Sequence, residues 1–495
     1  MTDSDFAALE IAAGLDPYDS EREPWRQPLT ELLLPSTVVR RNKLDISLGY
    51  CNEIQPSRLR SLGPAVEIRV NSPGELIEFL TLDAEDGRVH FVNHLPIQGE
   101  EDKREWEYVC FARKGEWTIF CSVFSTSLAF NPLFGDGKRR RLCSGGTRII
   151  GKKELQDALH GTLASPFEEL EQALRMGLDL SEAMTEKNLS NGFNVGGSKT
   201  LVYVERISQA SGQEAHIPTE RSREFARFMA EFHNSILQSL PLFIGTGSDL
   251  NFKAHYYDFC SRISPSYVGN PKAAKRWGRE AALDTTEPTA KGVMACIDAV
   301  SSYLGLEGTD QSILIKGVGG IGSRVTRYYV EQGWRVFVTD TDPARIDEMV
   351  RTFGERIVPV DEDNWMSVGS AAIFSPNSSS GSLTAENLPK LKALGVRAVI
   401  GGENNIRARG VDEESVYRDT GILTFADFLL NGGGAWIVDA EMVERPAQDV
   451  EDWIKSYQIP TLLKTIELAE ASGRSQSPES IFIEFIRRKV KELVA

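Results

Sequence analysis

The segment from residue 312 onward constrains the fold most, because short apolar runs alternate there with segments of helix length. This alternation is typical of a parallel sheet whose strands are connected by helices. The expected strands are 313–316, 335–339, 356–360, 371–374 and 398–400. The sequence therefore predicts an α/β fold, with a Rossmann-type domain in this part of the chain.

The first of these strands leads directly into Gly317-Val-Gly-Gly-Ile-Gly322, and a helix-length segment follows. Strand, glycine turn and helix in this order are typical of a dinucleotide-binding site. Gly317 permits the tight turn, Gly319 lets the backbone approach a pyrophosphate, and Gly322 lets helix and strand pack closely. The other turn residues expected to line the cofactor are Gly320 and Ile321.

Asp340 directly follows the second expected strand. A carboxylate at this position accepts hydrogen bonds from both ribose hydroxyls and repels a 2′-phosphate, so NAD is expected in preference to NADP. The alternative is a purely structural Rossmann domain with a glycine-rich turn. Asp342 is expected to cap the helix that begins at Pro343.

Composition excludes several classes of function. The formal net charge of −16 disfavours nucleic acid as a partner. We expect no membrane span, because no apolar run approaches the length of about 18 residues that a span requires. The N-terminus lacks the basic and apolar regions of a secretory signal. The six cysteines show no CxxC spacing and the six histidines no metal-ligand spacing, so we expect a cytoplasmic protein without a metal site.

Four regions are expected along the 495 residues. Residues 1–100 form a small α+β extension, with strands at 44–48, 65–70 and 89–92, and the charged run 99–105 marks its end. Residues 101–285 form an α/β domain for substrate binding and oligomerisation. Residues 286–445 form the Rossmann domain, and helices in 446–495 pack back on the body.

Within the region 101–285, we expect strands at 108–112, 117–124 and 201–205. Glycine turns are expected at 144–148 and before residue 201. A helix is expected over 166–188, because apolar residues recur there at helical spacing, namely Phe167, Leu170, Leu174 and Leu178.

Two lysines of this region have unusual surroundings. Lys187 in Met184-Thr-Glu-Lys187 and Lys199 in Gly196-Gly-Ser-Lys199 are flanked by small or polar residues. Taken alone, each is most simply a solvated side chain, because lysine is rarely buried.

Five blocks in order resemble the Glu/Leu/Phe/Val amino-acid dehydrogenase family, nearest its leucine and phenylalanine dehydrogenase branch. The resemblance runs from about residue 105 to residue 445. Its blocks are Ser144-Gly-Gly-Thr-Arg148, the two lysine segments, Pro288-Thr-Ala-Lys-Gly-Val293, Gly317–Gly322 with Asp340, and Asn431-Gly-Gly-Gly434.

The resemblance implies a role for each catalytic position. Lys187 would bind the substrate α-carboxylate, and Lys199 would polarise the α-carbon and activate water. Gly145 and Gly146 would bring the backbone close to the substrate. Asp249, in Asp249-Leu-Asn251, would be the proton donor, with a helix-capping aspartate as the alternative.

On the cofactor side, the resemblance places Thr289 at the nicotinamide amide and Asn405 near the nicotinamide ribose. Two departures from the family pattern stand nearby. Glu403 replaces a small residue, and Ser375-Pro-Asn-Ser-Ser-Ser380 replaces a loop of the type Ala-Pro-Cys-Ala-Leu-Gly. These departures put the geometry of the loop beside the cofactor in question.

Ser144 stands where the glutamate branch has a lysine that pairs with the substrate's side-chain carboxylate, so glutamate is not expected as the substrate. The other implied pocket residues, Ala435 and Val438, are apolar. The resemblance thus implies reversible NAD-dependent oxidative deamination of an L-amino acid with a bulky aliphatic or aromatic side chain. Its small-molecule partners would be the amino acid, the 2-oxo acid and ammonia, and the protein would be a homo-oligomer. Reductive amination or imine reduction of an unusual oxo acid, and a non-catalytic NAD-binding relative, are the alternatives.

Overall fold

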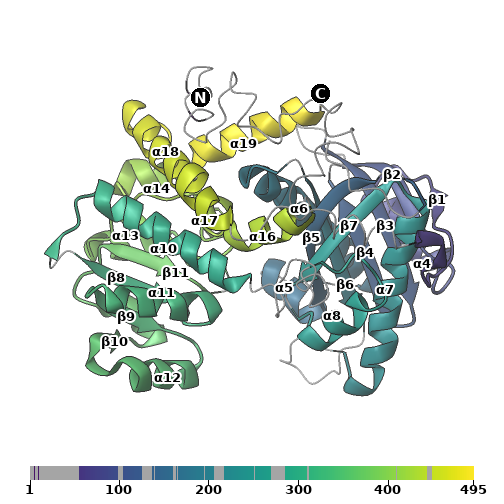
Figure 1. The fold of residues 1–495 in the computed structure, drawn as a ribbon, viewed down its shortest axis with the longest axis horizontal. Coiled ribbons are helices and arrows are strands. Elements are labelled where there is room, and N and C mark those ends of the chain that lie inside the picture. Colours follow the sequence, from purple (N-terminus) through teal and green to yellow (C-terminus); the bar gives the residue numbers. More distant parts are fainter. Residues whose placement is uncertain are drawn as a thin grey trace, which may run out of the picture. The chain divides into compact units, whose positions relative to one another are not determined.

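The computed structural model describes residues 5, 9, 55–97, 104–124, 136–138, 140–159, 163, 165–193, 195–205, 217–249, 251–268, 285–308, 311–378, 380–408, 410–442 and 449–494. These residues form two compact units, each built around its own sheet (Figure 1). The five-strand unit holds the described residues of 1–26, 284–437 and 447–492. The seven-strand unit holds those of 27–283, 438–446 and 493–495.

The five-strand sheet is parallel throughout and has the order β10-β9-β8-β11-β12. Its strands are β8 (Ser312–Lys316), β9 (Arg335–Thr339), β10 (Ile357–Pro359), β11 (Ile373–Pro376) and β12 (Ala398–Val399). Each lies within two residues of an expected strand. In chain order this is 3-2-1-4-5, which matches five of the six strands of the Rossmann order 3-2-1-4-5-6, so the predicted fold class is confirmed for this unit.

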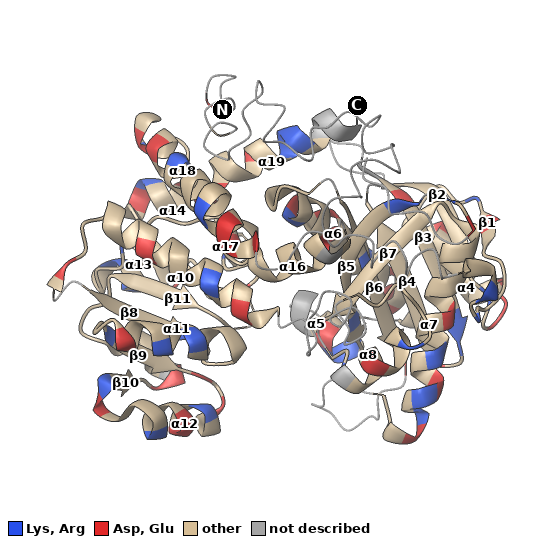
Figure 2. Ribbon diagram, in the orientation of Figure 1, with Lys and Arg blue, Asp and Glu red and all other residues tan. Residues whose placement is uncertain are grey.

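Three α-helices connect these strands, namely α11 (Gly320–Glu331), α12 (Pro343–Phe353) and α13 (Leu388–Ala393), and the 3-10 helix Glu362–Ser367 lies between β10 and β11. Helix α10 (Thr286–Tyr303) precedes β8, and α14 (Glu413–Thr420) and α15 (Asp427–Leu430) follow β12. Asp342 caps α12 as predicted, because its side chain accepts a hydrogen bond from the Ala344 N–H. Acidic and basic residues both lie along α12 and α18 (Figure 2).

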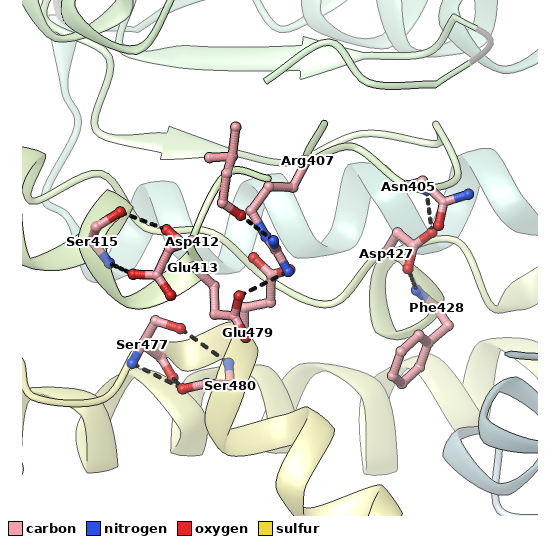
Figure 3. Close-up of polar contacts among 11 residues, drawn as sticks. Asn405, Arg407, Asp412, Glu413, Ser415, Asp427, Phe428, Ser477, Glu479 and Ser480 are labelled. Atoms are coloured by element: carbon pink, nitrogen blue, oxygen red, sulfur yellow. Dashed lines mark hydrogen bonds and ion pairs between the residues drawn. The ribbon is translucent and has the colours of Figure 1, made fainter. Parts of the chain in front are cut away.

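The C-terminal helices of the five-strand unit pack on its body, where α18 contacts α10. The helices are α16 (Gly433–Met442, which ends in the seven-strand unit), α17 (Asp449–Trp453), the π-helical turn Ile454–Gln458, α18 (Ile459–Ala471) and α19 (Pro478–Val494). Arg407, in the loop before α14, pairs with Glu479 of α19 at 3.1 Å and with Glu413 at 3.0 Å (Figure 3). This arginine therefore links α19 to the start of α14.

The seven-strand sheet is mixed and has the order β1-β2-β3-β4-β6-β5-β7. Strands β2, β3, β4 and β6 pair antiparallel, whereas β6, β5 and β7 pair parallel. The strands are β1 (Val66–Ile68), β2 (His90–Ile97), β3 (Arg104–Lys114), β4 (Trp117–Val123), β5 (Arg141–Ile150), β6 (Gly196–Val204) and β7 (Leu242–Ser248). The helices are α4 (Pro73–Leu82), α5 (Lys152–Leu159), α6 (Pro166–Ser190), α7 (Ser222–Ser239) and α8 (Ala254–Ser261).

Both faces of this sheet are covered by helices. Phe120 and Leu201 point into a core shared with α4 and α6, whereas their neighbours Cys121 and Val202 point into a core shared with α7 and α8. This follows from the alternation of side chains along a strand. The helix predicted over 166–188 is present, but Phe167 is 41% exposed and does not belong to its buried face.

The described part of residues 1–100 does not form a compact unit of its own. Strand β2 pairs with β3 from His90↔Phe111 to Ile97↔Arg104, so the charged run 99–105 spans the connection between neighbouring strands and the start of β3. A hairpin connection and a domain linker are both solvated, and their compositions are therefore alike. The strand expected at 44–48 lies outside the described residues.

Two further observations concern the described residues alone. None of their helices is long and apolar enough to cross a membrane. Their cysteines are buried and unpaired, namely Cys110, Cys121, Cys143, Cys260 and Cys296.

Candidate active site

Three adjacent strands of the seven-strand sheet bring Lys199, Gly146 and Asp249 together. Strand β5, which carries Gly146, lies between β6, which carries Lys199, and β7, which ends just before Asp249. The Lys199 ammonium donates a hydrogen bond to the Asp249 carboxylate. The lysine side chain is only 6% exposed, so the solvated alternative for Lys199 is wrong.

Glycine at position 146 leaves the space in which this pair meets. A Cβ there would lie 3.0 Å from Asp249 Cβ and 3.4 Å from Lys199 Nζ. At Gly145 a Cβ would lie 1.8 Å from the Ser198 carbonyl oxygen on the neighbouring strand. Both glycines are therefore required by close packing.

The glycine turns predicted at 144–148 and before residue 201 are wrong, because these residues lie inside β5 and β6. The physical reason is the same close packing. At Gly197 a Cβ would lie 2.1 Å from Thr185 N and 2.3 Å from Ser181 O, so α6 packs directly on the backbone of β6.

Arg148 completes the charged cluster, a role that the sequence analysis did not assign. Its Nε lies 3.2 Å and its Nη2 3.4 Å from the oxygens of Asp249. Residues 146 and 148 share a strand face because side chains alternate along β5, and this spacing is the signal that could have identified Arg148. Asp249 does not cap α8, whose N-cap residue is Lys253, so the capping alternative is wrong.

The electrostatics of the cluster favour a lysine that can exchange protons. Burial lowers the pKa of Lys199 below its ordinary value, the charge of Arg148 lowers it further, and Asp249 opposes both. A lysine with a lowered pKa is a better proton acceptor and donor near neutral pH.

Lys187 lies in the last turn of α6 and is half-buried. The next residue, Asn188, is fully buried and donates a hydrogen bond from Nδ2 to Ser144 Oγ at 2.9 Å. The end of α6 that carries Lys187 is thereby attached to β5 two residues before Gly146.

Asp439 of α16 lies against Ser144, and the sequence analysis missed it. Ser144 Oγ donates to Asp439 Oδ1 at 2.5 Å. Burial raises the pKa of Asp439 to about 7, although the Ser144 hydroxyl and the charge of Lys187 oppose the shift. Val438 and Ala435, the predicted apolar lining, are both half-buried, and Ala435 belongs to the five-strand unit. The predicted lining names only apolar residues of this helix, whereas Asp439, which follows Val438, is an acid.

In the five-strand unit, the glycines of the phosphate-binding motif have the predicted geometry. Gly317 has φ +88°, and a Cβ at Gly322 would lie 1.9 Å from the Gly317 carbonyl oxygen. At Gly319 the only described atom within 4 Å of a Cβ would be Arg345 Nη1, at 3.4 Å, so the end of a side chain, and no backbone atom, borders this position. Gly320 begins α11, and Ile321 lies under Gly402, where a Cβ would lie 2.9 Å from it.

The Asp340 carboxylate follows β9 as expected and is bound to the glycine turn. It accepts hydrogen bonds from the Val318 N–H at 2.8 Å and the Asp342 N–H at 2.9 Å. Arg345 Nη1 lies 3.5 Å from it, and the sequence analysis did not include this arginine. The turn thus presents both an acid and a guanidinium.

Thr289 and Asn405 also lie in the five-strand unit. Thr289 is buried near the start of α10, and its hydroxyl donates to the Thr285 carbonyl at 2.8 Å. Asn405 is exposed in a left-handed conformation with φ +52°, and its N–H donates to Asp427 at 2.7 Å (Figure 3). Their assigned cofactor contacts stay predictions.

The two departures from the family pattern bind each other. Glu403 is buried and accepts hydrogen bonds from Ser378 Oγ at 2.5 Å, Ser382 N at 2.8 Å and Ser382 Oγ at 2.7 Å. The loop after β11 is therefore held by Glu403. A Cβ at Gly317 would lie 2.8 Å from Asn377 C, which places this loop against the phosphate-binding turn.

The comparisons with known proteins agree with this geometry. Leucine dehydrogenase of Bacillus subtilis is 26% identical over 304 residues, which cover 60% of this chain and 76% of that protein. Phenylalanine dehydrogenase of Lysinibacillus sphaericus is 28% identical over 287 residues, which cover 57% of this chain and 68% of that protein. The chain is thus similar to leucine and phenylalanine dehydrogenases.

The fold of this chain is also found in a solved structure. The crystal structure of L-tryptophan dehydrogenase from Nostoc punctiforme has a TM-score of 0.54 and 20% sequence identity, and the match covers 79% of this chain and 97% of that one. No family model matches the chain. The predicted resemblance and the predicted fold class are thus confirmed.

Proposed function

We propose that this chain is an oxidoreductase that catalyses reversible NAD-dependent oxidative deamination of an L-amino acid other than glutamate. The products are the 2-oxo acid, ammonia and the reduced cofactor. The observation that carries the proposal is the buried Lys199, paired with Asp249 over Gly146, in a chain similar to leucine and phenylalanine dehydrogenases.

Each residue of the cluster then has a chemical task. Lys187 binds the α-carboxylate as a point charge. Lys199 polarises the α-carbon and activates the attacking water, and its lowered pKa lets it return the proton near neutral pH. Asp249 exchanges a proton with the amino group, and Arg148 orients its carboxylate. The cofactor supplies hydride acceptance from the α-carbon.

The glycine turn fits a dinucleotide, because Gly319 is the N-cap of α11, where backbone N–H groups can bind a phosphate, and only the end of the Arg345 side chain borders it among the described residues. Asp340 favours NAD, whereas a guanidinium such as that of Arg345 is the group that accommodates a 2′-phosphate. We propose NAD as the cofactor, and a comparison of kcat/KM for NAD and NADP tests this choice.

We further propose a homo-oligomer that works in the cytoplasm on small molecules alone. Buried and unpaired cysteines in the described part of the chain fit a reducing compartment. Size-exclusion chromatography with light scattering tests the oligomeric state.

The deciding experiment is a screen of cofactor reduction with L-amino acids, including non-proteinogenic ones. Replacing Lys199 by Ala should lower kcat at least about a hundredfold with folding intact. Lys390→Ala is the matched control, because Lys390 is an exposed residue paired only with Glu386 in the described structure.

Two outcomes would replace the proposal. Formation of secondary amines from oxo acids and amines, without primary amines, would indicate a reductive biosynthetic enzyme. Cofactor binding without turnover, with any trace activity surviving Lys199→Ala, would indicate a non-catalytic relative.

A further inference from the structure

A buried polar cluster of Ser144, Asn188 and Asp439 lies on the sheet face that carries Lys199. Asn188 donates from Nδ2 to Ser144 Oγ at 2.9 Å and to the Gly196 carbonyl at 3.0 Å. Ser144 in turn donates its single proton to Asp439 Oδ1 at 2.5 Å. Every side-chain donor of the cluster is therefore used.

Two acceptors of the cluster remain without a donor. Asp439 Oδ2 and Asn188 Oδ1 are buried, and neither has a hydrogen-bond partner among the described residues. The Asn188 amide cannot be turned to correct this, because its oxygen would then face the Gly196 carbonyl. Buried polar atoms are rarely left unpaired in folded proteins. Both oxygens therefore call for a group that donates hydrogen bonds.

The cluster lies close to the proposed reaction centre at Lys199, about the length of one amino-acid side chain away. Ser144 and Gly146 share one face of β5 and are separated by about 7 Å, at about 3.3 Å per residue. A Cβ at Gly146 would lie 3.4 Å from Lys199 Nζ. Lys187 and Val438, the sequence neighbours of Asn188 and Asp439, are half-buried, and the charge of Lys187 acts on Asp439.

We propose that Ser144, Asn188 and Asp439 form the side-chain subsite for an L-amino acid whose side chain ends in an amine. This inference rests on the proposed deamination and narrows its substrate class. An ammonium group has three donors and a positive charge, and it would satisfy both free acceptors and the carboxylate. A substrate side chain that ends in an amine thus replaces the aliphatic or aromatic side chain that the apolar residues Ala435 and Val438 alone led us to expect.

An apolar side chain would leave the two acceptors unpaired, and this is the basis of discrimination. Sites built to bind a polar group reject the analogue that lacks it far more strongly than apolar pockets reject a methylene. L-Ornithine and L-norleucine provide the matched pair, because an ammonium in the first occupies the place of a methyl in the second. L-Lysine extends the series by one methylene, and 5-hydroxynorvaline supplies a neutral donor.

The test measures kcat/KM for these four amino acids with the full-length enzyme and its Asp439→Asn and Asp439→Leu variants. We expect the wild type to prefer ornithine or lysine to norleucine by at least about tenfold. Both variants should lose this preference, and Asp439→Leu should use norleucine at least as well as the wild type does. Asp347→Asn, at an exposed position of α12, is the control.

Preference of the wild type for norleucine would overturn the subsite, as would an ornithine-to-norleucine ratio unchanged in both variants. Deamination of apolar amino acids would then still support the proposed function. If no amino acid is deaminated, the proposed function fails instead. The subsite is then judged by calorimetric binding of ornithine and norleucine to wild type and Asp439→Asn, where equal affinities would overturn it.

Discussion

Replacing Asp439 by Asn should make the stability of the seven-strand unit less dependent on pH. Burial raises the pKa of the folded carboxyl from 3.8 to about 7, so between these values the folded state binds a proton that the unfolded state has lost. Stability of the wild type therefore falls as pH rises through this window, and the loss is complete above pH 7. Asparagine keeps the acceptor for Ser144 and removes the titration.

The magnitude follows from the window. Each pH unit is worth about 1.4 kcal/mol per proton, so the span from pH 5 to pH 7 amounts to about 3 kcal/mol. The variant should gain about this much relative to the wild type between pH 5 and pH 8. Glu479, whose pKa burial also raises to about 7, titrates in both proteins and cancels in the difference.

The assay is urea unfolding of both proteins at pH 5 and pH 8, followed by hydrogen-exchange mass spectrometry on peptides of β5 and β6. These peptides report the seven-strand unit separately from the other unit. A difference between the two proteins that is the same at both pH values would refute the assignment of a buried, titrating carboxyl to Asp439.

Two further predictions concern the five-strand unit. Gly322→Ala should raise the dissociation constant of NADH at least about tenfold and lower the melting temperature, because the new Cβ would lie 1.9 Å from the Gly317 carbonyl oxygen. Calorimetry measures both quantities. The control is Gly369→Ala, because nothing lies within 4 Å of a Cβ at that position. Arg407→Met should destabilise the unit by about 3 kcal/mol at pH 8 and by less at pH 5, because Glu479 would be left ionised without its partner. Chemical unfolding at both pH values tests this, and equal losses would contradict it.

The fold of the five-strand unit followed from the sequence because its signals are local. Alternation of apolar strands with helix-length segments fixed the strands, and the order Gly317 to Gly322 fixed the turn between β8 and α11. The seven-strand unit was harder. Gly145 and Gly197 stand in glycine-rich segments that are typical of turns, but both residues lie within strands. Glycine is needed there because the backbone of a neighbouring element lies close by, and the local sequence contains no sign of this.

The catalytic cluster was predicted in part for the same reason. Lys199 and Asp249 could be named from the motifs that carry them, and the structure joins them across β5. Asp439 could not be found in this way. Its partner Ser144 lies 295 residues earlier in the chain, and the sequence of a helix that carries both Asp439 and Glu441 gives no sign of which partner either acid faces.

The departures from the family pattern become interpretable when they are taken as pairs. Neither Glu403 nor the serine loop 375–380 was expected, yet the Glu403 carboxylate accepts a hydrogen bond from the Ser378 hydroxyl of that loop. Ser144 stands where the glutamate branch is expected to have a lysine, and it binds the buried carboxylate of Asp439. In the subsite that we propose, an acid thus lies beside the position where the glutamate branch is expected to have a cation. Complementarity of charge then favours a substrate with a cationic side chain over one with an anionic side chain.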